Sequence, residues 1–204
     1  MDEVTSHEEL RELLGEPLPR VAQKDRPRLH DFDRQWLAAS RFCLVATAGA
    51  DGRCDVSPKG DPAGFALVLG DTVIAIPERP GNRRADGFHN IIDNPHAGLI
   101  FLLPGRGDTL RINGKARLVR DAGYFDRMMV KGHRPVLALE VEIEEVFYHC
   151  SKAFLRSELW RPETWDPAVA PSRAQIAKAL ERPDDDLAEI ERYYGPAYAD
   201  TIYT

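Results

Sequence analysis

The stretch from Thr109 to Arg120 alternates apolar and polar residues, and this pattern predicts a long β-strand with one buried face. Successive side chains of a strand point to opposite faces of the sheet. The apolar positions are Leu110, Ile112, Ala116 and Leu118, and the polar positions are Arg111, Asn113, Lys115 and Arg117. Such a strand needs a neighbour on each edge, so the rest of the chain must supply an extended sheet.

A second alternating run, Val136 to His149, predicts another long strand. Its apolar face carries Leu137, Leu139, Val141 and Ile143, and its other face carries Glu140, Glu142 and Glu144. Shorter apolar runs predict strands at residues 42–47, 53–57, 65–69, 72–76 and 97–103. Gly70-Asp71 separates two of these runs and suits the turn of a hairpin.

These six or seven strands follow one another mostly through hairpins, with one helix inserted midway at residues 82–93. We therefore expect a mainly β protein with flanking helices, in which an antiparallel sheet closes into a small barrel. Further helices are predicted at residues 7–14, 32–40, 122–130, 172–181 and 184–193. Gly105-Arg106-Gly107 begins like a dinucleotide fingerprint but leads into a strand, so it is predicted to form a hairpin turn.

The length of 204 residues suits one domain with terminal extensions. We expect an N-terminal helical extension at residues 1–40, the barrel domain at 41–150 and a C-terminal helical extension at 151–204. Asp184-Asp185-Asp186 precedes the last predicted helix and is expected to cap it.

The net charge of −6 argues against a general nucleic-acid or membrane-surface binder, because both favour a basic footprint. No run of about 18 apolar residues occurs, so no membrane span is predicted. The acidic start of the chain lacks the order of a signal peptide, and we expect a cytoplasmic location. Cys43, Cys54 and Cys150 lack disulfide or metal-ligand spacing, so we expect no metal site, and burial of Cys43 and Cys54 in strands.

Asn82-Arg83-Arg84 is predicted to form the first turn of the midway helix, with Asn82 as its N-cap. Two arginines are electrostatically misplaced there, because a helix N-terminus carries partial positive charge and normally attracts carboxylates. A bound anion would explain them, since free backbone N–H groups at a helix N-terminus form a phosphate cradle. We therefore predict a bound phosphate ester.

Two other segments carry cations. Ser57-Pro58-Lys59-Gly60 is predicted to be a strand-ending turn, and hairpin folding would bring Lys59 and Arg79 to the arginine pair. The alternative for these cations is a solvated charge face. The segment from His149 to Trp160 mixes cations with an indole, which is typical either of a site for a planar anionic ligand or of a basic surface turn.

These motifs, in this order, resemble the pyridoxamine 5′-phosphate oxidase-like superfamily of FMN-binding split barrels, over residues 30 to 160. The likeness is greatest to its small bacterial branch of FMN-dependent enzymes. Cys54 to Gly60, with Ser57, Pro58 and Lys59, resembles the family strand whose end holds the flavin. Ile76-Pro77 stands where the backbone of a family residue pair faces the isoalloxazine, although it lacks the usual aromatic and hydroxyl groups.

The remaining cofactor residues are carried over from the same resemblance. Arg79 and Asn82-Arg83-Arg84 are similar to the phosphate-binding segment of the family. Thr109 to Gly114, with Thr109 and Arg111, resembles a strand that lines the same pocket. Lys152, Arg156 and Trp160 resemble late residues that reach the flavin from a neighbouring subunit.

The resemblance implies a split β-barrel, non-covalent FMN and a homodimer with FMN at its interface. It implies an oxidoreductase that transfers hydride or electrons between FMN and a small molecule, with the C-terminal extension packed on the barrel or on the partner. The C-terminal arginine–histidine element of classical pyridoxamine-phosphate oxidases is missing, so that substrate is not expected. No catalytic side chain is assigned.

Two alternatives stay open at this point. The first is a flavin-binding protein without turnover, serving storage or sensing. The second is a pyridoxal-phosphate or haem binder on the same barrel, and haem would need an axial ligand such as His89 or His149.

Overall fold

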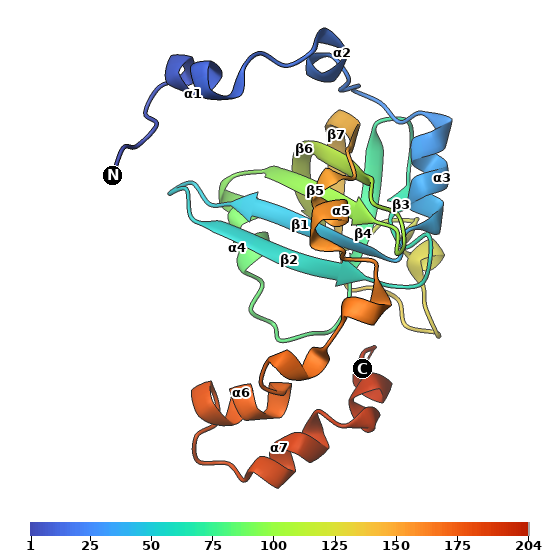
Figure 1. Ribbon diagram of the computed structural model, residues 1–204. Coiled ribbons are helices and arrows are strands. Elements are labelled where there is room, and N and C mark those ends of the chain that lie inside the picture. Colours follow the sequence, from blue (N-terminus) through green and yellow to red (C-terminus); the bar gives the residue numbers. More distant parts are fainter. Residues whose placement is uncertain (204) are drawn as a thin grey trace.

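In the computed structural model, which describes residues 1–203, seven strands form an antiparallel sheet in the order β2-β1-β5-β6-β7-β4-β3 (Figure 1). The sheet curls into a half-barrel with flanking helices, which confirms the predicted split barrel. The strands are β1 (Phe42–Ala48), β2 (Cys54–Gly60), β3 (Leu67–Val68), β4 (Val73–Glu78), β5 (His96–Leu102), β6 (Thr109–Val119) and β7 (Leu137–His149). Every predicted strand is present, but β3 is shorter and β2 longer than expected.

The helices lie around and beyond the barrel. They are α1 (His7–Leu14), α2 (Pro19–Ala22), α3 (Asp31–Ala39), α4 (Asp86–Asp93), α5 (Lys152–Ser157), α6 (Arg173–Leu180) and α7 (Leu187–Tyr193). In Figure 1, α1 and α2 extend above the barrel, and α6 and α7 lie below it. Asp186 accepts hydrogen bonds from the first turn of α7, so the predicted acidic cap is confirmed. Among residues 1–203, none of the helices has the length and apolarity to span a bilayer.

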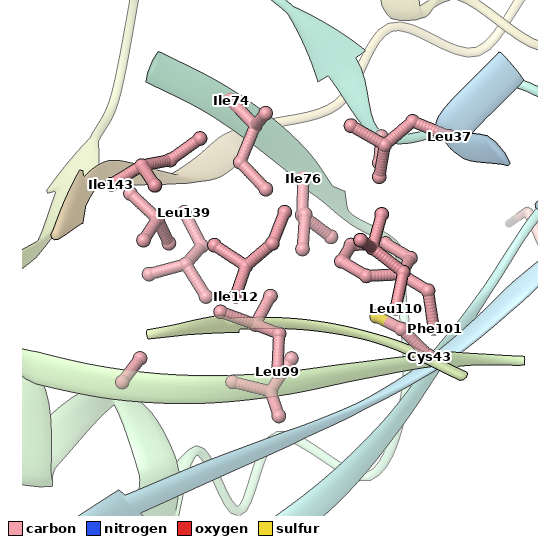
Figure 2. Packing of buried hydrophobic residues seen from close by; sticks show 14 of the residues in the cluster. Leu37, Cys43, Ile74, Ile76, Leu99, Phe101, Leu110, Ile112, Leu139 and Ile143 are labelled. Atoms are coloured by element: carbon pink, nitrogen blue, oxygen red, sulfur yellow. The ribbon is translucent and has the colours of Figure 1, made fainter. Parts of the chain in front are cut away.

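The hydrophobic core fills the inside of the curled sheet (Figure 2). Side chains from β1, β4, β5, β6 and β7 meet there, and Leu37 adds α3 to the same cluster. Ile91 attaches α4 to the core and is 3% exposed. Burial of each large apolar side chain contributes about 1.5–3 kcal/mol, so this cluster holds both helices on the barrel.

The β6–β7 ladder contains a β-bulge that changes the phase of β7. Asn113 pairs with Glu145 and Gly114 pairs with Ile143, so Glu144 is the extra residue. Ile143 and Val146 are consequently both buried. The alternation predicted for β7 therefore ends at the bulge.

Glu140 lies on the polar face of β7 as expected, but it is buried because the chain after β6 covers this side chain. Glu140 is 6% exposed, and it accepts hydrogen bonds from the Tyr124 hydroxyl (2.5 Å) and from Arg117 Nε (2.6 Å). The prediction of a helix at residues 122–130 is wrong, since this segment forms only the 3₁₀ turn Phe125–Met128. Phe125 is fully buried and fixes the turn against the sheet.

Candidate functional site

A pocket of about 460 Å³ lies between β1, β2, the loop after β4 and the start of α4. Its apolar lining includes Val45, Pro77, Phe88 and Ile91. It also brings together eight of the predicted cofactor residues, namely Ser57, Pro58, Lys59, Gly60, Pro77, Arg79, Asn82 and Arg84.

β2 is an edge strand with one half-buried face and one exposed face. The predicted turn is wrong: Ser57-Pro58-Lys59-Gly60 continues the strand and pairs with β1. Proline is tolerated there because an edge strand has one side without a ladder. The half-buried positions are Asp55, Ser57 and Lys59, whereas Cys54, Val56, Pro58 and Gly60 are exposed. Cys54 is thus exposed, contrary to expectation, while Cys43 is buried as predicted.

The polar side chains of β2 are held by neighbours in the pocket wall. Ser57 Oγ donates a hydrogen bond to Asp55 Oδ2 at 2.7 Å. Lys59 Nζ binds the Glu78 carboxylate and lies 4.8 Å from the centroid of the Phe88 ring. The Lys59 side chain is 17% exposed, so it presents a positive charge from a partly desolvated position.

α4 begins at Asp86, so the prediction that Asn82 caps it is wrong. The chain enters the helix through two residues in the left-handed conformation, Arg83 (φ 62°) and Ala85 (φ 57°). Asn82 Oδ1 instead accepts a hydrogen bond from the backbone N–H of Arg84 at 3.0 Å. Ala85 occupies the N-cap position without a side-chain hydrogen bond, so the first N–H groups of α4 are left uncapped beside the pocket.

Gly87, in the first turn of α4, allows this helix to approach the sheet closely. A Cβ atom at Gly87 would lie 2.9 Å from Asp55 Oδ2 and 3.3 Å from Thr47 Oγ1. Asn90, one turn further on, donates a hydrogen bond to Thr47 Oγ1 at 3.1 Å. The N-terminus of α4 is therefore fixed against β1 and β2.

Arg79 lies where the pocket meets the loop that follows β6. Its Nε donates to Asp61 Oδ2 at 2.6 Å, and its two terminal nitrogens donate to the carbonyl oxygens of Met128 (2.6 Å) and His133 (3.2 Å). The side chains of Arg79 and Asp61 are 12% and 2% exposed. Arg79 is thus a fixed part of the wall.

The pocket cations differ in how firmly they are paired. Arg84 binds Asp86, and both side chains are well exposed, at 76% and 44%. An exposed ion pair contributes little to stability, so an incoming anion could replace Asp86 at small cost. Lys59 and Arg79 are far less exposed; Glu78, the partner of Lys59, lines the pocket, and Asp61, the partner of Arg79, is nearly buried behind it. The arrangement suits an anion that binds at Arg84 and the start of α4.

The other predicted residues, all within the described chain, do not line this pocket. Ile76 is buried in the core, and Arg83 is exposed beside the lining. Thr109 and Arg111 lie on β6, and Lys152, Arg156 and Trp160 lie in or just after α5. Within the described chain, none of these residues lines the pocket.

Trp160 and Arg111, two of the predicted residues outside the pocket, have contacts of their own. Trp160 Nε1 donates to the Arg106 carbonyl at 2.6 Å, and its ring stacks on Phe154 with centroids 6.0 Å apart. The Arg111 guanidinium lies 5.1 Å from the centroid of the Phe147 ring, and its Nε is buried without a hydrogen-bond partner in the described chain. The neighbouring His149 has a lowered pKa, caused by desolvation and by the charges of Lys24 and Arg111.

Sequence reasoning missed several residues of the pocket. Asp55 could have been found, because the strand period that selects Ser57 and Lys59 also selects Asp55. Thr47, Asp61 and Gly87 carried no comparable signal. Thr47 and Gly87 line the pocket and Asp61 binds Arg79 only because the fold brings together elements that are far apart in the chain.

The fold and the pocket define the class of protein: a split barrel with a cationic pocket at a helix N-terminus. A family model described as Pyridoxamine 5'-phosphate oxidase matches residues 29–150, and the chain belongs to this family. No curated protein matches the chain.

Solved structures resemble part of the chain. HupZ from Group A Streptococcus is 18% identical, with 59% of this chain and 93% of that chain covered and a TM-score of 0.48. A general stress protein 26-related protein from Clostridium acetobutylicum is 15% identical, with coverages of 58% and 86% and a TM-score of 0.44. An F420 reductase is 19% identical, with coverages of 57% and 94% and a TM-score of 0.40.

Proposed function

We propose that this chain is an FMN-dependent oxidoreductase that acts as a homodimer on a small molecule. The observation that carries the proposal is the convergence of Lys59, Arg84 and the uncapped N-terminus of α4 on one pocket, in a member of this family. Phosphate binds well at such a helix end, because the backbone N–H groups and the helix dipole both favour negative charge.

The residues present fit FMN in two respects. The volume of about 460 Å³ is in the usual range for small-molecule sites. The pocket also offers an apolar wall from Val45, Pro77 and Phe88 beside its cationic part. An isoalloxazine ring needs the apolar wall, and a phosphate ester needs the cationic part of the pocket.

FMN would supply the redox chemistry, by accepting and donating hydride or electrons at its ring. The residues of this chain would bind the phosphate, orient the ring and exclude water from one of its faces. The described residues that line the pocket include no histidine, which favours a flavin over a haem with an axial histidine. We assign no side chain as a catalytic acid or base.

Three of the predicted residues outside the pocket fit a shared site. Lys152 and Arg156 are exposed, and Trp160 is half-buried near them, outside the pocket of their own chain. In a homodimer, these residues would complete the flavin site of the partner. This part of the proposal rests on the family resemblance and on their separation from the pocket.

The test compares Arg83→Ala/Arg84→Ala with Arg20→Ala/Arg28→Ala, a control pair of exposed arginines near the N-terminus. We expect purified protein to retain flavin absorbance after added FMN is removed. The site double variant should raise the Kd for FMN roughly tenfold or more, because charge-assisted phosphate contacts are the stronger class of hydrogen bond. The control pair should leave the Kd unchanged.

Equal FMN affinity in both double variants would remove the main argument for a phosphate site. Oxidation of NADH or NADPH by the FMN-loaded protein would separate an enzyme from a flavin-storage protein. Absorbance would also distinguish flavin from pyridoxal phosphate or haem, the two other ligands that the barrel suggested.

A further inference from the structure

Tyr203, in the C-terminal segment, returns the chain to the barrel beside the pocket wall. Its hydroxyl donates a hydrogen bond to Asp61 Oδ1 at 2.7 Å. Its ring stacks on His133, with centroids 6.0 Å apart and an interplanar angle of 18°. The cations of Arg79 and Lys131 lie 5.6 Å and 5.7 Å from the ring centroid. Tyr203 is therefore held by a hydrogen bond, a ring stack and two cation–π contacts.

The Asp61 carboxylate connects this tyrosine to Arg79. One carboxylate oxygen accepts from Tyr203, and the other accepts from Arg79 Nε at 2.6 Å. The Asp61 side chain is 2% exposed, so water cannot replace either partner easily. Burial and the hydrogen bond to Asp61 raise the pKa of Tyr203, so the phenol remains a donor at neutral pH.

Arg79 is shared by two hollows. Together with Pro77 it lines the 460 Å³ pocket and also a smaller hollow of about 200 Å³, formed with Asp61 and the loop around Met128. Arg79 and Pro77 thus form the wall between the two. Because the same Arg79 side chain borders both hollows, a contact that holds it through Asp61 also holds the part of the pocket wall that Arg79 forms.

Tyr203 also affects how strongly Asp61 neutralises Arg79. A buried carboxylate with a single donor concentrates its charge on that donor, whereas a second donor shares it. With Tyr203 in place, Asp61 leaves more of the Arg79 charge available to an anion in the pocket. Without Tyr203, Asp61 would keep only its hydrogen bond from Arg79 among these two donors and would neutralise the Arg79 charge more fully.

We propose that Tyr203 is a positioning residue for the anion pocket: it docks the C-terminal segment on Asp61 and so keeps Arg79 in the wall beside the phosphate site at Arg84 and the start of α4. The inference rests on the proposed function, because it names a further determinant of the same site. It also predicts that ligand binding and docking of the C-terminal segment strengthen each other, since coupling between two sites is reciprocal.

The experiment measures the Kd for FMN and for riboflavin, which lacks the phosphate, by quenching of flavin fluorescence. Tyr203→Ala should raise the Kd for FMN roughly three- to tenfold and leave that for riboflavin unchanged. Tyr203→Phe keeps the ring contacts and should recover part of the loss. The control is Tyr198→Ala, because Tyr198 packs on Tyr193 and Tyr194 within the C-terminal segment and should not affect either Kd.

A second readout is hydrogen exchange of residues 196–203, which FMN should slow in the original protein but not in Tyr203→Ala. Equal FMN affinity of Tyr203→Ala and the original protein would overturn the inference and leave the proposed function standing. A parallel loss of FMN and riboflavin binding would also overturn it, because that result indicates general damage to the barrel. If the original protein binds neither FMN nor inorganic phosphate, the proposed function and this inference both fail.

Discussion

Asp33 is the residue that fixes the N-terminal segment on the barrel. It is fully buried, and it accepts hydrogen bonds from Arg26 Nη1 (2.8 Å), Arg26 Nη2 (3.0 Å) and the backbone N–H of His30 (2.7 Å). Arg26 also forms a β-bridge to Val146 of β7. The pair therefore connects the start of α3 to the sheet.

We predict that Asp33→Asn lowers the free energy of unfolding by about 2–4 kcal/mol at neutral pH, because it leaves Arg26 without its charged partner. Burial alone would raise the pKa of Asp33, but the hydrogen bonds from Arg26 and His30 outweigh it and lower the pKa. The stabilisation is then fully present above the unfolded-state pKa of about 3.9 and is lost as the pH falls through the folded-state value. Asp33→Asn should remove this acid-dependent loss.

Urea unfolding at a series of pH values between neutral and strongly acidic checks this prediction. Asp71→Asn serves as the control, because Asp71 pairs with Arg34 from an exposed position and should leave stability nearly unchanged. If Asp33→Asn and Asp71→Asn give the same unfolding curves at every pH, the ion pair has no structural role.

At the scale of elements, the β6–β7 ladder depends on Gly114. A Cβ atom there would lie 2.0 Å from the Glu142 carbonyl oxygen, which is backbone and cannot turn aside. We predict that Gly114→Ala costs at least about 3 kcal/mol or prevents folding, because the two longest strands would have to separate at the bulge.

Gly98→Ala is the matched control for this prediction. Gly98 lies on the neighbouring strand β5 opposite Asn113, and its added Cβ would lie 3.2 Å from the Asn113 Oδ1 atom, a side-chain atom that can move. Urea midpoints measured with unchanged m-values should therefore fall much less for Gly98→Ala. A Gly114→Ala protein as stable as Gly98→Ala would show that the bulge can relax.

The same elements show what the sequence could predict. The two long strands, β6 and β7, followed from their period of two, because each has one face in the core, and the shorter strands followed from apolar runs bounded by turn residues. The bulge at Gly114 and the late start of α4 did not follow, since each depends on contacts with another element or on a left-handed residue such as Ala85. Lys59, Arg79, Asn82 and Arg84 could be predicted from a local charge and helix-end signal, and Ser57, Pro58, Gly60 and Pro77 from the family resemblance. Gly87, in contrast, is selected only by its distance from β2.

At the scale of the whole molecule, the outer face of β2, β1 and β5 carries exposed and half-buried apolar side chains. Residues directly opposite in a ladder share a face, which places Ala46 with Val56 and Leu44 with Pro58 on the outer face of β1 and β2. Ile100 of β5 lies opposite Leu44 and extends the same face. Val56 is 58% exposed. Apolar surface that continues over adjacent strands is typical of a protein–protein interface, and it is the surface through which we expect the homodimer to form.

We predict that Ala46→Lys converts the proposed dimer to a folded monomer, because Ala46 is exposed on this face but, unlike Val56, does not line the pocket. The Ala46 side chain is already exposed in the single chain, so the lysine should leave the free energy of unfolding of the monomer nearly unchanged. Burying an unpaired ammonium in the interface should raise the dimer dissociation constant roughly tenfold or more. Sedimentation over a range of protein concentrations measures this constant. Val136→Lys is the control, because Val136 is 74% exposed just before β7 and lies outside this face.

The flavin content of the same variant tests whether the site is shared between subunits. If Lys152, Arg156 and Trp160 complete the site of the partner, Ala46→Lys should lose FMN in proportion to its loss of dimer, while Val136→Lys keeps both. A monomeric Ala46→Lys protein with full FMN affinity would show that one chain holds the flavin alone, and the proposed role of these three residues would then be wrong. An Ala46→Lys protein that remains dimeric would place the interface on another surface of the barrel.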